Sequence, residues 1–101
     1  MSLDAFAMKL QQDYPFIGAH LAHRFANSYG SLTHTLLSKA NSESDLGQHF
    51  GNQLYQVEVD YLIDHEWARS AEDILWRRTK LGLEFTADQV SALESYLQSK
   101  L

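Results

Sequence analysis

The sequence predicts an all-α fold, a small helical domain of five or six helices packed as an orthogonal or irregular bundle. Helix-breaking residues are sparse, because the 101 residues include one proline and five glycines. Apolar residues recur at helical spacing in several segments, and helix-capping sequences occur at Ser70 and Thr86. With 45% hydrophobic and 12% aromatic residues, the chain can order one core. We expect no β-sheet.

Two amphipathic helices are predicted in the first third of the chain, one on each side of Pro15. Gly30 is expected to end the second of them at its C-terminal cap. A short third helix follows, and then a loop at 41–44. The apolar positions that predict these three helices are Leu3, Phe6, Ala7 and Leu10, then Ile17, Leu21, Phe25 and Ala26, and finally Leu32, Leu36 and Leu37.

The middle of the chain allows two interpretations. Apolar and polar residues alternate from Tyr55 to Ile63, which on periodicity favours a strand. No second segment alternates in the same way, and a lone strand would leave its backbone donors and acceptors unpaired. We therefore predict a helix here, preceded by a turn at 47–51 with a glycine at each end.

Two further helices are predicted in the last third of the chain from their caps. Ser70, followed by acidic residues, has the form of an N-terminal cap, and Gly82 is expected to stop that helix. The sequence Thr-Ala-Asp-Gln at 86–89 is a capping box, with Phe85 and Val90 at the positions of a hydrophobic staple. The last helix would face inward through Val90, Leu93 and Leu97.

Composition excludes several classes of function. The chain has no cysteine, which excludes disulfides, thiolate metal sites and a cysteine nucleophile. Its net charge of −5 opposes non-specific nucleic-acid binding and electrostatic docking on anionic lipid. No apolar run approaches the ~20 residues that span a bilayer, and residues 1–12 lack the pattern of a signal peptide. We therefore expect no nucleic-acid partner and no direct membrane contact by this domain.

A long motif at 66–83, EWARSAEDILWRRTKLGL, is similar to a stretch near the end of the respiratory, FAD-dependent glycerol-3-phosphate dehydrogenases. Shorter pieces agree with that family in the same order, at 22–30 (AHRFANSYG), 45–51 (DLGQHFG) and 58–62 (EVDYL). Together they cover roughly residues 20–85. The chain therefore resembles the C-terminal helical domain of this family. Because no calcium-binding EF-hand loop occurs in it, the bacterial form is indicated.

The resemblance implies that residues 1–101 follow an FAD-binding and a substrate-binding domain that are absent here. The full enzyme would oxidise glycerol 3-phosphate to dihydroxyacetone phosphate and pass the electrons through FAD to membrane quinone. It would be cytoplasmic, peripheral on the cytoplasmic face of the inner membrane, with a homodimer as a possible assembly. The partner of this domain would be the missing FAD-binding domain. No G-x-G-x-x-G fingerprint occurs in this chain, so we assign it no catalytic, cofactor-binding or metal-binding residue and expect the fragment to be inactive.

Two alternatives from other classes remain open. One is a free-standing helical protein-interaction module, which an upstream reading frame of several hundred residues would exclude. The other is a helix-turn-helix DNA binder that uses residues 77–80 in its recognition helix. The negative net charge opposes the second alternative.

The segment 69–80 holds four of the chain's eight basic residues. They could contact a substrate or FAD phosphate or an acidic neighbouring domain, or they could pair within the domain. On a helix Arg78 points about 100° away from Arg77, so one ligand meeting the whole cluster is disfavoured. Asp73 stands four residues before Arg77, which favours an internal ion pair, and the length of the motif predicts that Arg77 or Arg78 is buried. The candidate ion-pair or interdomain residues are Arg69, Asp73, Arg77, Arg78 and Lys80.

Two tryptophans, Trp67 and Trp76, lie within the motif. Each buries a large area when it packs, so each is a candidate for the core or for an anchor against the missing domain. In the second case the isolated chain would expose an apolar patch.

Five histidines invite a metal interpretation. His20 and His23 would share one helix face, as in some bundle sites. Those sites also need carboxylates at matched positions on facing helices, and the Glu-x-x-His pattern is missing. We therefore expect no metal, and His65 beside Glu66 has no nucleophile near it in the sequence.

Overall fold

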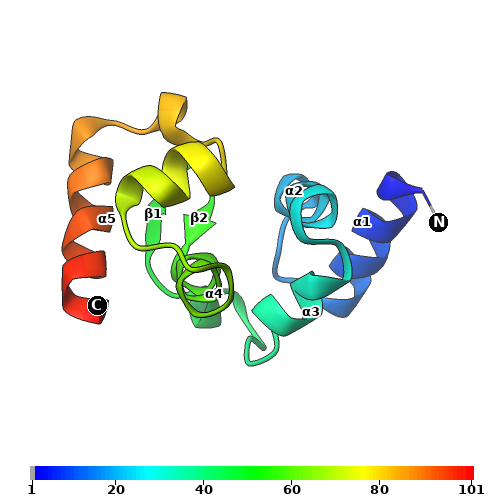
Figure 1. Ribbon diagram of the computed structural model, residues 1–101. Helices are drawn as coiled ribbons and strands as arrows, with labels where there is room; N and C mark the ends of the chain where they lie inside the picture. The colour runs from blue at the N-terminus through cyan, green and yellow to red at the C-terminus, as the bar shows by residue number, and fades with distance from the viewer. Residues whose placement is uncertain (1) are drawn as a thin grey trace. The chain divides into compact units, whose positions relative to one another are not determined.

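The computed structural model describes residues 2–101 and is mostly helical (Figure 1). Within these residues it contains five α-helices, one short two-stranded sheet and several short 3₁₀ and π turns. The helical prediction is confirmed, whereas the expectation of no sheet is wrong. The chain forms two compact units that divide between Gly47 and Gln48, and each is described by itself.

The first unit is built on two helices that pack side by side, α1 (Leu3–Asp13) and α2 (Ala19–Tyr29) (Figure 1). Helix α1 begins at Ser2, whose hydroxyl accepts a hydrogen bond of 3.1 Å from the backbone N–H of Ala5. The apolar stripes predicted for both helices are buried. Their buried residues are Ala7 and Leu10 from α1, and Leu21, Ala22, Phe25 and Ala26 from α2.

Helix α2 ends at Gly30, as predicted, because this glycine takes the positive φ of 53° that other residues avoid. A 3₁₀ turn at Gly30–Leu32 leads into the short helix α3 (Thr33–Leu36). The Thr33 side chain is buried, and its hydroxyl donates to the backbone oxygen of Phe25 at 3.4 Å. This bond satisfies a polar group that burial would otherwise penalise.

Polar contacts also join the helices of the first unit. His23 Nε2 lies 2.9 Å from Asp4 Oδ1, which connects α2 to α1. Tyr14, at the end of α1, shares a 2.8 Å hydrogen bond with His34 of α3. A further 3₁₀ turn at Glu43–Leu46 follows and buries Leu46.

The second unit opens with a hairpin of two short antiparallel strands, β1 (His49–Gly51) and β2 (Leu54–Tyr55). The two residues between them, Asn52 and Gln53, both have positive φ, at 45° and 64°. Such a turn matches the twist of paired strands. The sequence does not reveal it, because glutamine rarely adopts positive φ and the strands are too short to show alternation. The prediction of a turn at 47–51 is wrong, because residues 49–51 form β1 and the chain turns at Asn52 and Gln53.

Helix α4 (Gln56–Glu66) confirms the helical interpretation of the alternating segment. Its buried face is wide enough to include Val59, Tyr61 and Ile63, which are two residues apart, so the apolar pattern resembles the alternation of a strand. The buried positions are Glu58, Val59, Tyr61, Leu62 and Ile63. The helix ends at Trp67, which has a left-handed φ of 65°.

The segment after α4 begins a new helix at Ser70, as its cap sequence predicts. The Ser70 hydroxyl accepts a hydrogen bond from the backbone N–H of Asp73 at 3.1 Å. The turns that follow widen into a π-helix, η3 (Asp73–Arg78). Its closing bond runs from the N–H of Thr79 to the oxygen of Ile74 at 2.9 Å, five residues back.

Gly82 does not stop this helix, so that prediction is wrong. The helix ends at Arg78, and Lys80 takes the left-handed turn with a φ of 61°. Gly82 begins a 3₁₀ turn, η4 (Gly82–Glu84), and lies against the indole of Trp76. A Cβ at position 82 would stand 2.4 Å from Trp76 Cε2, so here glycine permits a close approach rather than a cap.

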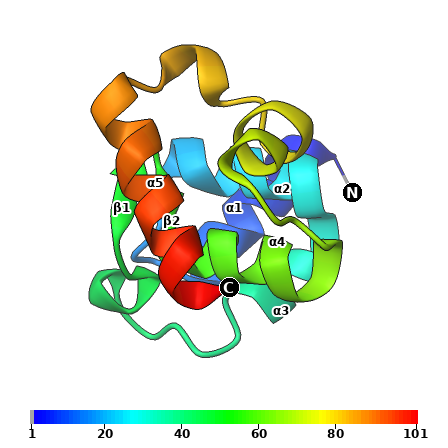
Figure 2. The same cartoon turned by 60° about the vertical axis from the view of Figure 1, so that its left-hand side comes forward.

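The last helix, α5 (Ala87–Lys100), starts with the capping box that the sequence predicts, between Thr86 and Gln89. It buries Leu93 and Leu97. Figures 1 and 2 both show it running alongside the hairpin, against which it packs.

A polar cluster joins α5 to α4, and we call it the α4–α5 clamp (Asp60, Tyr96 and Lys100). The hydroxyl of Tyr96 donates to Asp60 Oδ1, and Lys100 Nζ lies 3.4 Å from the same oxygen. Burial, reinforced by the hydrogen bond to Asp60, raises the pKa of Tyr96 well above its ordinary value. Tyr96 therefore stays a neutral hydrogen-bond donor through the ordinary pH range.

Candidate functional site

Four of the candidate residues named from the sequence meet at one hollow beside η3. Trp67, Asp73, Arg77 and Arg78 line it together with Ala68, and its volume is about 260 Å³. We call it the Trp67 hollow. The Trp67 ring stands at its edge largely in solvent, with 78% of the residue exposed.

Both arginines of the Trp67 hollow pair with carboxylates of the same unit. Arg77 Nη1 lies 3.8 Å from Asp73 Oδ1, one helical turn earlier. Arg78 reaches the end of α4, where Nη2 donates to the backbone oxygen of Glu66 at 2.8 Å and Nη1 lies 3.6 Å from its carboxylate. Arg78 thus also satisfies a terminal helix carbonyl.

The expectation that Arg77 or Arg78 is buried is wrong. Their side chains are 74% and 42% exposed. The buried face of η3 is formed by Ile74 and Leu75 instead. The basic residues extend outward, because the long side chains can reach the carboxylates at the edge of the hollow while remaining hydrated.

The remaining basic candidates lie apart from the Trp67 hollow. The guanidinium of Arg69 donates to the backbone oxygens of Ala68 at 3.0 Å and Ile63 at 3.4 Å. Its backbone N–H donates to Asp73 Oδ2 at 3.2 Å. Arg69 therefore supports the end of α4, whereas Lys80 stands in the left-handed turn after η3.

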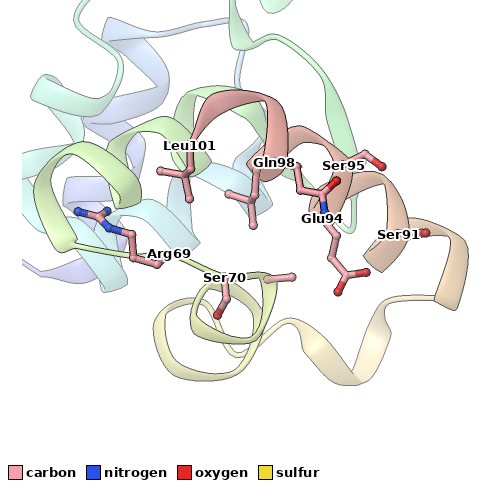
Figure 3. A pocket seen from close by; sticks show the side chains of 9 residues that line it. Arg69, Ser70, Ser91, Glu94, Ser95, Gln98 and Leu101 are labelled. Carbon is pink, nitrogen blue, oxygen red and sulfur yellow. The ribbon is translucent and has the colours of Figure 1, made fainter.

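A longer depression, which we call the α5 groove, runs between α5 and the segment 69–76. It consists of two adjoining hollows of about 550 and 440 Å³ that share Ala71 and Glu94. Figure 3 shows Glu94 extending from α5 toward the η3 segment, while the Arg69 guanidinium turns away toward α4. Trp76 lines the second hollow and is 49% exposed. The first hollow is lined by Arg69, Ser70, Ala71, Ser91, Glu94, Ser95, Leu97, Gln98 and Leu101.

Sequence reasoning did not find the α5 groove. A signal was available, because polar residues recur three and four positions apart along the last helix, at Ser91, Glu94, Ser95 and Gln98. Such a stripe is also what an ordinary solvated helix face looks like. Only the position of the segment 69–76 beside α5 makes this stripe one wall of a groove.

Among residues 2–101, no three His, Cys, Asp or Glu side chains stand close enough together to hold a metal ion. His23, one of the histidines considered from the sequence, instead pairs with Asp4. In the same residues no helix combines the length and apolarity needed to cross a bilayer.

Comparison with known proteins assigns the chain to a family. A family model described as the C-terminal domain of alpha-glycerophosphate oxidase matches residues 3–99. The chain belongs to this family. The match includes both compact units, the Trp67 hollow and nearly all of the α5 groove.

Individual members of the family are similar over nearly the whole chain. The aerobic glycerol-3-phosphate dehydrogenase of Escherichia coli is 47% identical over 94 residues, 93% of this chain. The glycerol-3-phosphate dehydrogenase of Pseudomonas aeruginosa is 48% identical over 99 residues, 98% of the chain. The D-erythritol 1-phosphate dehydrogenase of Brucella abortus is 36% identical over 96 residues, 95% of the chain. This chain spans 19% of the length of each of these relatives.

These findings confirm the resemblance drawn from the motif at 66–83. They also show that it extends beyond residues 20–85, because the family match begins at residue 3. The chain corresponds to the C-terminal domain of glycerol-3-phosphate dehydrogenases.

Proposed function

We propose that this chain is the C-terminal domain of an FAD-dependent glycerol-3-phosphate dehydrogenase. The whole enzyme oxidises glycerol 3-phosphate to dihydroxyacetone phosphate and passes the electrons through FAD to quinone at the cytoplasmic face of the inner membrane. The observation that carries the proposal is the identity of 47–48% with two glycerol-3-phosphate dehydrogenases over 93–98% of the chain. The identity with the D-erythritol 1-phosphate enzyme is lower, at 36%, which favours glycerol 3-phosphate as the substrate.

Within that enzyme the domain has a structural and interface role, and the catalytic and flavin-binding groups belong to the preceding part of the polypeptide. One support is that relatives named for two different substrates share this domain. A domain that is retained when the substrate changes is better suited to a structural role than to substrate recognition. A second support is local. Each arginine of the Trp67 hollow pairs with a different carboxylate, Arg77 with Asp73 and Arg78 with Glu66, which supports structural pairing within the domain over joint binding of one phosphate.

The experiment compares three proteins: the full-length enzyme, the same enzyme truncated before residue 1, and residues 1–101 alone. Each is assayed for bound flavin by its visible absorbance and for reduction of an artificial electron acceptor by glycerol 3-phosphate. The full-length enzyme should be yellow and active, and residues 1–101 should be colourless and inactive. The truncated enzyme should keep a flavin-binding fold but lose stability.

Two results would refute the proposal. One is flavin bound by residues 1–101 alone, or turnover by them. The other is a coding sequence that lacks a dinucleotide-binding G-x-G-x-x-G segment upstream of residue 1, which would favour the free-standing interaction module.

A further inference from the structure

Trp67 occupies a backbone position that does not suit its side chain. It caps the C-terminus of α4 with a φ of 65°, and its N–H donates to the oxygen of Leu62. Glycine is the usual residue at such a cap, because a side chain at positive φ is strained. A bulky residue there is an outlier. With 78% of the residue exposed, the indole gains little burial within residues 2–101 to offset that strain.

The segment that follows Trp67 in the chain also differs in charge from the remaining sequence. The segment 69–80 contains four basic and two acidic residues, whereas the other positions hold four basic and eleven acidic residues. Among the charged side chains that line the hollow, Arg77 is the most exposed, at 74% against 42% for Arg78 and 29% for Asp73. An exposed indole beside guanidinium groups is the composition of an interface centre, where Trp and Arg are enriched.

We propose that the Trp67 hollow is a docking surface for the preceding part of the same polypeptide, and that the docked segment presents an apolar side chain together with a carboxylate. This inference rests on the proposed function and names the surface through which the domain acts. The apolar group would cover the Trp67 indole, and the carboxylate would pair with Arg77, which has capacity for a second acceptor.

The length of the relatives indicates that the segment docked on the Trp67 hollow belongs to the same polypeptide. This chain aligns with 19% of each dehydrogenase, so about four fifths of such an enzyme lies outside it. A covalently linked partner is present at a high effective concentration. A second copy of this chain fits less well, because a two-fold contact would bring the basic segment against itself. An anionic membrane is opposed by the net charge of −5.

The test measures how fast hydroxyl radicals oxidise Trp67, in residues 1–101 alone and in the full-length enzyme, by mass spectrometry of the same peptide. Trp67 should be oxidised several-fold more slowly in the full-length enzyme. Arg77→Glu in the full-length enzyme should restore much of the oxidation, because the reversed charge repels the docked carboxylate. The matched control is Lys80→Glu, which makes the same charge change three residues away and outside the Trp67 hollow, and it should leave Trp67 protected.

A second measurement separates docking from a structural role. Trp67→Gly in residues 1–101 alone should leave the melting temperature unchanged or raise it, because glycine accepts the left-handed cap without strain. A large fall in the melting temperature would show that the indole supports the fold itself, and would overturn the proposal.

Three oxidation results would also overturn it. Equal oxidation of Trp67 in both proteins would show that the hollow faces solvent in the enzyme. Protection that grows with enzyme concentration would assign the surface to a second copy. Protection that appears only with vesicles of phosphatidylglycerol and phosphatidylethanolamine would assign it to the membrane. The same full-length sample is also assayed for its enzymatic turnover of glycerol 3-phosphate. Turnover without protection of Trp67 would overturn the docking proposal and leave the proposed function intact.

Discussion

The α4–α5 clamp and the Trp67 hollow lie in the same compact unit and combine the same kinds of groups, an aromatic ring with a cation and a carboxylate. In the clamp, Tyr96 is half-buried and its hydroxyl is bonded to Asp60. In the hollow, the ring of Trp67 and the side chain of Arg77 are mostly in solvent. The two regions therefore use similar chemistry at different degrees of exposure: the cation of the clamp, Lys100, has a side chain 32% exposed, against 74% for Arg77 in the hollow.

That difference decides what each region contributes. A polar contact that is partly removed from water costs more to break, because its partners lose a hydrogen bond that water replaces less readily. An exposed ion pair contributes little, because water and salt already screen its charges. The clamp is thus a stabilising element, whereas the exposed groups of the hollow remain available to another surface.

The largest effect is expected at the core beneath the hollow. Ile74 lies on η3, next in the chain to Asp73, and is fully buried. Ile74→Ala should lower the free energy of unfolding by about 2–5 kcal/mol, since it removes buried apolar atoms and leaves a cavity. Urea denaturation of residues 1–101 measures this loss. Trp67→Ala is the control, and a loss of similar size there would mean that the hollow belongs to the core.

A smaller loss is expected from the clamp. Asp60→Ala removes the acceptor of the Tyr96 hydroxyl and the partner of Lys100, which should cost about 1–3 kcal/mol. Asp64→Ala makes the same change at an exposed position of α4 and should be nearly neutral. Equal effects of the two changes in urea denaturation would show that the clamp does not stabilise the unit.

The clamp should also make stability depend on pH. The pKa of Tyr96 is raised from 10.0 in the folded protein, first by burial and then by the hydrogen bond to Asp60. The folded state therefore holds this proton more tightly than the unfolded chain, so the stabilisation is complete below about pH 10 and is lost as the pH rises further. Denaturation midpoints from about pH 8 to pH 11 should fall less steeply for Tyr96→Phe than for the parent. The midpoint of Tyr96→Phe should still fall somewhat with rising pH, because burial also raises the pKa of Tyr14 and Tyr61.

The smallest effect is expected for the arginines of the hollow. Arg77→Ala should cost only about 0–1 kcal/mol, because the pair with Asp73 is exposed. Arg78→Ala should cost somewhat more, since its guanidinium also bonds the backbone oxygen of Glu66. Thermal melting of both variants checks this order. A fall of several degrees for Arg77→Ala would show that its pair with Asp73 contributes more than an exposed ion pair usually does.

Much of the helical fold could be predicted because the deciding interactions are local. The cap at Ser70 and the capping box at Thr86 each join groups three residues apart, so a short stretch of sequence contains both partners. Gly30 ends α2 for an equally local reason, its freedom to adopt positive φ. The hairpin escaped prediction because its turn uses Asn52 and Gln53 at positive φ instead of glycine.

The candidate site was predicted only in part. The motif at 66–83 drew attention to the residues that line the Trp67 hollow, but their exposure could not be read from it. A tryptophan and an arginine have the same helical spacing whether they face a core or water.

The sequence by itself determined the helical class, most helix ends and the family, because these depend on local backbone preferences and on a long specific motif. Only the tertiary structure decided which residues are exposed and which polar groups pair. Those outcomes depend on contacts such as Tyr96 with Asp60, 36 residues apart, and on the position of the segment 69–76 beside α5. Gly82 shows the same division: the sequence suggested a helix stop, whereas the packing of Trp76 against it explains why a glycine is needed there.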